Sequence, residues 1–165
     1  MLVGDKSKFA VQITVKEAVD GWILGSYLLW ACGTSIGNEG DCSVDLKGCR
    51  SWMSDFVETP RDRYEVGLYE MDKLQVYVRL ASAVLPGQNP SGFAKEMYVD
   101  IFSRFHLSHI GMSSFDNVTL LLLKNEKGLE RLIWRSGDGE IKDALFEDGE
   151  IERVFREAIR ALTPH

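Results

Sequence analysis

An alternation of apolar and polar positions opens the chain. Residues 9–15, FAVQITV, are apolar at every odd position and mostly polar between. A period of two is typical of a strand with one buried face, so this pattern predicts a strand over 9–15. A short apolar start and a Gly4-Asp5 turn precede the strand, and we expect folded structure to begin at residue 2 without a leader segment.

A second strand, predicted over 21–32, is apolar on both faces. Its sequence, GWILGSYLLWAC, places large apolar side chains at even and odd positions alike. Two apolar faces are typical of a strand in the middle of a sheet. Gly25 within it indicates a bulge or a close approach of another segment. Glycines at 33, 37 and 40 predict a turn, and a short strand is predicted over 42–46.

An apolar stripe at helical spacing predicts a helix over 49–58. The helix begins after Asp45 or after 47–48, and it ends before Pro60, because the residue before a proline avoids the helical conformation. The stripe consists of Trp52, Met53, Phe56 and Val57.

A further helix is predicted from an N-cap at Asp72 through Leu85, where Pro86 stops it. Residues 86–92, PGQNPSG, have the composition of a loop. Another helix is predicted over 93–105. The inward side chains of the helix that begins at Asp72 are predicted to be Leu74, Val78, Ala81 and Leu85.

Three strands and a helix complete the prediction. The strands are predicted over 117–124, 129–135 and 140–146, with turns rich in Asn, Asp and Gly between them. A final helix is predicted over 150–162, with acids early and Arg160 late, as suits the helix dipole. Together the elements predict an α+β fold in one domain over 1–165. We expect a mainly antiparallel sheet of about five or six strands, packed by three or four helices.

The charge of the chain is modestly acidic. The formal net charge is −6, which disfavours direct binding of nucleic acid, because that needs a basic face. It permits a basic protein partner, although solubility alone is the simpler interpretation. No apolar run approaches the roughly 20 residues of a membrane span. No export signal is present, so we expect a cytoplasmic protein that does not bind a membrane.

The chain offers few groups for catalysis. Cys32, Cys42 and Cys49 are expected to be free thiols of a reducing compartment, and a disulfide between the last two is the less favoured alternative. Cys32 ends an apolar strand, and we interpret it as packed rather than reactive.

His106 and His109 have a spacing that could serve a metal-dependent hydrolase together with Asp116. Capping or solvated histidines are the simpler interpretation. No nucleophile elbow and no phosphate-binding glycine motif occurs in the sequence. We therefore expect no catalytic site, no metal and no cofactor.

Acidic side chains concentrate in two stretches of the sequence. They form either a solvated surface or a docking surface for a basic protein, with a nearby aromatic side chain as anchor. The candidate partner-binding residues are Glu39, Asp41, Asp45, Trp52, Asp55 and Glu58 in the first stretch, and Asp138, Glu140, Phe146, Glu147 and Asp148 in the second.

Both ends of the chain carry motifs of a known family. Residues 2–6, LVGDK, form an apolar-Gly-Asp turn, and residues 8–11, KFAV, start the strand that follows. Near the other end stand 114–116 (SFD), 130–134 (ERLIW) and 147–150 (EDGE). These motifs resemble those of the immunity protein 42 family.

The resemblance extends over about 1–32 and 112–162 and is weak over 60–111, where partner specificity is expected. It implies a bacterial immunity protein of the cytoplasm, which binds the toxic C-terminal domain of a secreted protein delivered by cell contact or by a type VI apparatus. Such a protein acts by stoichiometric binding, without turnover, and an acidic one favours a basic, nuclease-like toxin. A cytosolic structural or regulatory module remains the alternative, and the oligomeric state stays open.

Overall fold

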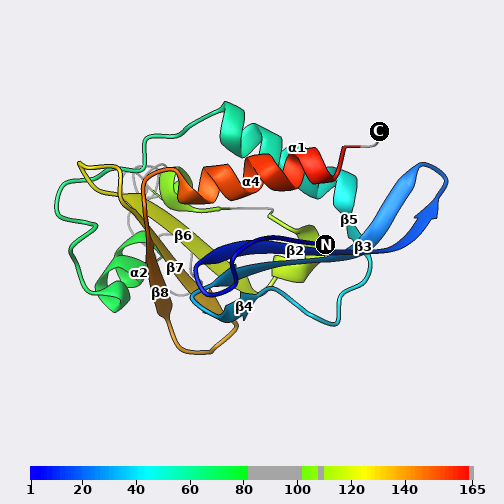
Figure 1. Cartoon of the computed structure of the whole chain (residues 1–165). Helices are drawn as coiled ribbons and strands as arrows, with labels where there is room; N and C mark the ends of the chain where they lie inside the picture. Colours follow the sequence, from blue (N-terminus) through cyan, green and yellow to red (C-terminus); the bar gives the residue numbers. More distant parts are fainter. Residues whose placement is uncertain (82–101, 108–109, 164–165) are drawn as a thin grey trace. The chain divides into compact units, whose positions relative to one another are not determined.

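The computed structural model describes residues 1–81, 102–107 and 110–163, and these form two compact units. Unit 1 takes its described residues from 1–60, 109–118 and 149–165. Unit 2 takes its described residues from 61–108 and 119–148. Each unit is therefore assembled from segments that are far apart in the sequence (Figure 1).

In the described residues of unit 1, five strands form one antiparallel sheet. The long central strand β3 pairs with β2, β4 and β5, which confirms the central position predicted from its two apolar faces. Strands β1 and β4 were not predicted, since three residues carry too little pattern. The strands are β1 (Leu2–Gly4), β2 (Phe9–Val19), β3 (Trp22–Ala31), β4 (Thr34–Ile36) and β5 (Val44–Asp45).

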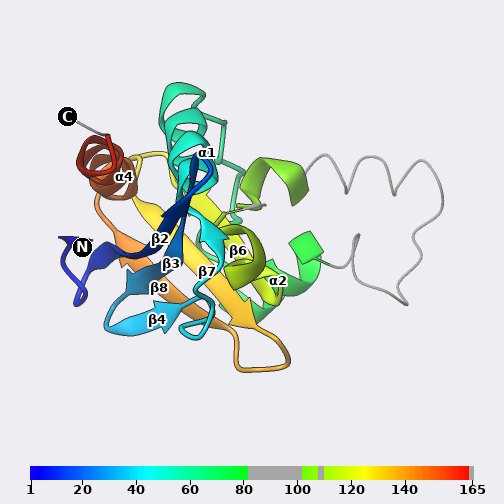
Figure 2. The same ribbon diagram turned by 90° about the vertical axis from the view of Figure 1, so that its right-hand side faces the viewer.

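Two helices, α1 (Leu46–Glu58) and α4 (Glu150–Ala161), lie side by side on one face of this sheet (Figure 1 and Figure 2). The apolar positions of β2 face them, and Phe9 meets Phe155 of α4 edge to face, with ring centroids 5.6 Å apart. The alternation that opens the sequence thus defines the core of unit 1. A short 3-10 helix, η1 (Met112–Phe115), belongs to the same unit.

Gly25 is a site of close approach, as predicted. A Cβ atom at this position would lie 2.1 Å from the backbone oxygen of Thr14 on β2. The pairing of β2 with β3 shifts register at this point, between Val15 and Glu17, so that Lys16 has no partner on β3. Only glycine fits where the two backbones come this close.

Helix α1 begins at Leu46, three residues before the predicted range of 49–58. The side chain of Asp45 caps it by accepting a hydrogen bond from the Lys47 backbone N–H at 3.0 Å. Of the two predicted starts, Asp45 is therefore the one that the structure uses. The helix ends at Glu58, with Thr59 as its C-cap, as the following proline requires.

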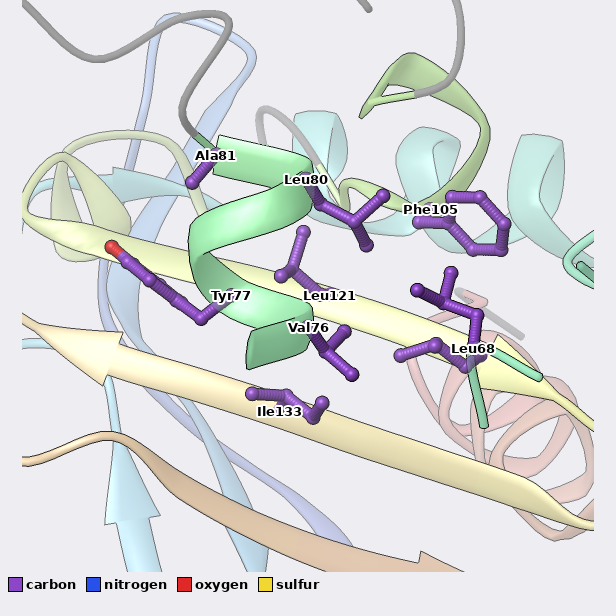
Figure 3. Packing of buried hydrophobic residues seen from close by; sticks show 9 residues of the cluster. Leu68, Val76, Tyr77, Leu80, Ala81, Phe105, Leu121 and Ile133 are labelled. Carbon is purple, nitrogen blue, oxygen red and sulfur yellow. The ribbon is translucent and has the colours of Figure 1, made fainter. Parts of the chain in front are cut away.

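Among the described residues, unit 2 is built on a three-stranded antiparallel sheet of β6 (Val118–Lys124), β7 (Glu130–Ser136) and β8 (Lys142–Phe146). Helix α2 (Lys73–Ala81) packs on this sheet, and residues 102–105 are also helical. The side chain of Val76 lies between α2 and the strands, near Leu121 and Ile133, and Leu80 points toward Phe105 (Figure 3). These contacts form a second apolar core.

The predicted inward face of α2 was wrong. Leu74 is 55% exposed and Val78 is 47% exposed, whereas Val76, Tyr77 and Leu80 are buried. The segment has apolar side chains around most of its circumference, so the pattern alone does not fix how the helix is rotated. Ala81 is buried as predicted, and Leu85 lies outside the described residues.

A buried arginine fixes the segment that leads into α2. The Arg131 guanidinium donates to the backbone oxygens of Tyr69, at 2.7 Å, and of Met71, at 2.6 Å. It also pairs with the Asp143 carboxylate on β8 at 2.7 Å. Because these bonds satisfy the buried charge, Arg131 has a structural role in unit 2.

The α+β class and the antiparallel pairing are confirmed, while the described strands are divided between two sheets where one was predicted. The C-terminal strands and the final helix lie where the sequence predicted them. The predicted loop over 86–92 and most of the predicted helix over 93–105 fall outside the described residues. No helix among the described residues is long and apolar enough to cross a membrane.

Candidate functional site

The loop between β4 and β5 of unit 1 carries Glu39 and Asp41. One oxygen of the Asp41 carboxylate accepts hydrogen bonds from the Ser43 N–H at 2.9 Å and from the Ser43 hydroxyl at 2.7 Å. The other oxygen accepts from the Ser113 hydroxyl at 2.5 Å. These donors, Ser113 foremost, lower the pKa of Asp41. Asp41 is therefore an anion held in one orientation.

Helix α1 carries two further acids of the predicted set on its surface. Asp55 and Glu58 are exposed and three residues apart, so they share one face near the C-terminal end of the helix. Trp52 is half-buried and meets Phe155 of α4 edge to face, with ring centroids 5.8 Å apart. Trp52 thus contributes to the packing of α1 on α4, and only part of its ring faces solvent.

The acids of unit 2 lie at the two ends of β8. Asp138 and Glu140 are exposed in the turn before this strand, and Glu147 and Asp148 are exposed directly after it. A strand of five residues, about 17 Å long, lies between the two pairs. They are therefore two separate pairs of carboxylates rather than one cluster.

Two features of unit 2 make its acidic residues less suitable for docking a partner. The ammonium of Lys124 lies 3.6 Å from a carboxylate oxygen of Asp148, which offsets part of its charge. Phe146 is only 5% exposed and belongs to the core. A partner that docks on this unit would therefore not reach the Phe146 ring.

A pocket that was not predicted lies on the face of the first sheet that points away from α1 and α4. Its volume is about 400 Å³. The Lys6 ammonium stands 3.8 Å from the centroid of the Trp30 ring, and the Trp30 N–H donates to the Gln12 side chain at 3.1 Å. Lysines, hydroxyls and this indole line an open, polar hollow, which is completed by Glu39 and Cys42.

Part of the signal for this pocket is visible in the sequence. Gln12, Thr14 and Lys16 of β2 are polar. Ser26, which pairs with Thr14, and Trp30 of β3 line the same pocket. A half-polar face on a central strand indicates a surface that is solvated or bound by a partner. The loop residues that close the pocket come from a distant segment, which local patterns do not reveal.

Of the two candidate histidines, the structure describes His106. His106 stacks on Phe102, with ring centroids 4.5 Å apart, and His109 lies outside the described residues. Asp116 is exposed in unit 1, whereas His106 belongs to unit 2. Within the part of the chain that is described, no group of three or more His, Cys, Asp or Glu side chains could hold a metal ion.

The three cysteines are free thiols, as predicted. Cys49 is buried in unit 1, while Cys32 and Cys42 are exposed. The interpretation of Cys32 as a packed side chain was wrong. The residue follows the last position of β3 and has a positive φ of 47°, so the chain turns away from the sheet before its side chain can be covered.

Comparisons with known proteins agree with the resemblance seen in the sequence. A family model described as immunity protein 42 matches residues 1–161. The fold is similar to the crystal structure of CdiI from Burkholderia dolosa AUO158, with a TM-score of 0.74 and 16% identity over 98% of this chain and 99% of that chain. A search of curated proteins gives no match. Since the family match spans nearly the whole sequence, this chain belongs to the immunity protein 42 family.

Proposed function

We propose that this immunity protein neutralises one cognate toxin domain by binding it stoichiometrically in the cytoplasm of the cell that it protects. The observation that carries the proposal is the family match over residues 1–161. The shared fold with a CdiI protein supports contact-dependent inhibition as the route by which the toxin arrives. On this proposal the chain acts by occupying a surface of the toxin, and no bond is made or broken.

We further propose that the acids of unit 1 form the docking surface and that the toxin is basic, as a nuclease would be. Asp41 is held as an anion by its serine donors, and Asp55 and Glu58 are exposed on one face of α1. With 13 residues, α1 spans about 20 Å. A standard interface of about 800 Å² per partner covers that distance.

The acids of unit 2 are the second candidate surface, and the contacts favour unit 1. Asp148 is already paired with Lys124, and its neighbour Phe146 is buried. Asp138 and Glu140 carry the same formal charge as Asp55 and Glu58, so they provide a matched comparison in another unit.

The proposed function predicts that a secreted toxic protein is encoded beside the gene of this chain, and the C-terminal domain of that protein is the partner used in the test. Expression of that domain alone is expected to stop growth, and co-expression of this chain is expected to restore it. The purified mixture is expected to contain a 1:1 complex by light scattering. Growth that co-expression does not restore would contradict the proposal.

Titration of the purified chain into an assay of the toxin separates binding from turnover. Stoichiometric neutralisation predicts that inhibition saturates when the two proteins are equimolar, because each chain occupies one toxin domain. Complete inhibition at a hundredth of the toxin concentration would show that the chain acts as an enzyme.

A further inference from the structure

Exposed apolar side chains gather on the hairpin that joins β2 to β3. Trp22 is 55% exposed and its cross-strand partner Val19 is 42% exposed, so these two side chains share one face of the hairpin. Val15 is 57% exposed and pairs with Gly25 on the other face. Within unit 1, this hairpin extends past β5 and the start of α1 (Figure 1). A tryptophan left half in solvent beside an exposed valine is a feature of surfaces that a partner covers.

The hairpin holds these side chains in a fixed geometry. Val19 pairs with Trp22, and the two residues between them, Asp20 and Gly21, have positive φ angles of 48° and 82°. This is the two-residue turn that suits the twist of a hairpin. The Lys47 ammonium at the start of α1 donates a hydrogen bond to the carbonyl oxygen of Gly21. A tip that is braced in this way loses little conformational freedom when it binds.

The apolar tip is continuous with one face of the sheet. Residues of β3 alternate, so Trp22 shares its face with Ser26 and Trp30, both of which line the pocket. Lys16, where the register shifts, lines the pocket and is the pocket residue of β2 nearest to the tip. The tip and the pocket therefore form one strip, with an indole ring at each end.

The charges around the tip indicate the charge expected on the surface of the partner. Glu17 and Asp20 are exposed on the hairpin beside Trp22, and Asp45 pairs with Leu24 on the neighbouring strand. The Lys47 ammonium nearby already donates to a backbone oxygen. The exposed Lys16 lies farther along β2, where it lines the pocket. Carboxylates therefore outnumber ammonium groups around the apolar tip, which complements a basic surface.

We propose that the tip of this hairpin, formed by Val19 and Trp22, is the anchor of the toxin complex. It inserts into an apolar hollow with a basic rim on the cognate toxin domain. The inference rests on the proposed function, and it adds a hydrophobic anchor to the acidic docking surface. Neither Trp52, which packs on α4, nor the buried Phe146 is then needed as the anchor.

The test measures how tightly the cognate toxin domain binds variants of the full chain. The toxin domain is first inactivated by mutation, and binding is measured by calorimetry. Trp22→Ala is expected to weaken binding by about 30-fold, the loss typical of a central aromatic anchor. Leu145→Ala is the matched control, because Leu145 is 63% exposed and lies in unit 2. Its affinity is expected to stay within about twofold of the wild-type value.

The outcomes separate this inference from the proposed function. A wild-type chain that does not bind the toxin domain contradicts both. If the wild-type chain binds the toxin domain and Trp22→Ala lowers the affinity by less than about tenfold, the result overturns the anchor alone. If the free chain is a dimer that Trp22→Ala dissociates, the hairpin covers a second copy and the anchor is likewise overturned.

Two further measurements distinguish a lost contact from a folding defect and test the anchor in the wild-type chain. The melting temperature of Trp22→Ala is expected to equal that of the wild type, because the side chain is exposed. In the wild-type complex, hydrogen exchange over residues 15–22 is expected to slow relative to the free chain. Unchanged exchange over the hairpin would overturn the anchor without any substitution.

Discussion

Cys49 is the residue whose environment most alters its chemistry. Burial raises the pKa of its thiol from 9.0 to about 12, and the Asp45 carboxylate adds to this effect. Tyr27, which is fully buried close to this thiol, has its pKa raised well above the usual value, also through burial. The core of unit 1 thus holds two groups that ionise readily only in the unfolded chain.

The pH dependence of stability follows from the raised pKa of Cys49. Above pH 9 the unfolded thiol releases its proton while the folded thiol keeps it until about pH 12, so the unfolded state binds fewer protons. The Cys49 thiol alone is therefore expected to lower the free energy of unfolding by about 1.4 kcal/mol per pH unit in this window. Urea unfolding at a series of pH values measures the slope.

Cys49→Ala is the control for this slope. The substitution removes the ionisation, so stability is expected to fall less steeply above pH 9 than in the wild type, whatever its value at pH 7. Tyr27 remains in both proteins and contributes equally to both slopes. Parallel slopes in the two proteins would show that the thiol does not carry the effect.

At the scale of the element, Asp45 has two roles that the choice of substitution separates. Its side chain caps α1, and its charge belongs to the proposed docking surface. Asparagine caps a helix about as well as aspartate, whereas alanine does not. Comparing the two variants therefore distinguishes the structural role from the electrostatic one.

Asp45→Ala is expected to lower the free energy of unfolding by about 1 kcal/mol, and Asp45→Asn by no more than about 0.5 kcal/mol. Both variants lose the charge, so both are expected to bind the toxin domain with a slower association rate. Urea unfolding and stopped-flow binding measure the two effects. An Asp45→Asn variant that associates as fast as the wild type would remove Asp45 from the docking surface.

Helix α2 shows which part of an element the sequence predicts. Its existence and its start follow from the N-cap signal at Asp72, whose side chain accepts from the Leu74 N–H at 2.9 Å. Its rotation does not follow, since apolar residues surround the helix and only packing on the second sheet selects the buried set. The buried faces of the strands were predicted more reliably, because a shift of one residue in a strand would move every side chain to the opposite face.

The rotation of α2 has a direct test. Leu80 is 1% exposed and Leu74 is 55% exposed, so Leu80→Ala is expected to cost about 3 kcal/mol through the cavity that it leaves. Leu74→Ala is expected to change the free energy of unfolding by less than about 0.5 kcal/mol. Urea unfolding of the two variants measures both values, and a larger cost for Leu74→Ala would restore the rotation predicted from the sequence.

At the scale of the whole molecule, local patterns predict the α+β class but not which strands share a sheet. Pairing of β3 with β5 joins residues some 20 positions apart, and the pocket brings Lys6 and Glu39 to one hollow. Such contacts depend on tertiary structure that no short window contains. The sequence shows the two acidic stretches. It does not show whether the carboxylates of each stretch form one cluster or separate pairs in the folded chain. The expectation of one domain over 1–165 stays a prediction.

The net charge of −6 leads to a prediction about association with a basic toxin. Reversing Asp55 and Glu58 to lysine, or Asp138 and Glu140 to lysine, changes the net charge of the chain to −2 in either case. The charge of the whole molecule is then the same in both variants, and only its position differs. Screening over about 10 Å at 0.1 M salt makes that position decisive.

Docking on unit 1 predicts that Asp55→Lys with Glu58→Lys lowers the association rate by about tenfold at low salt, and that Asp138→Lys with Glu140→Lys lowers it by much less. Stopped-flow association over a series of salt concentrations measures both rates and their slopes. Equal losses in the two variants would mean that net charge alone steers the encounter. A larger loss for the unit 2 variant would move the docking surface to the turn before β8, and no loss in either would show that the toxin does not present a basic face.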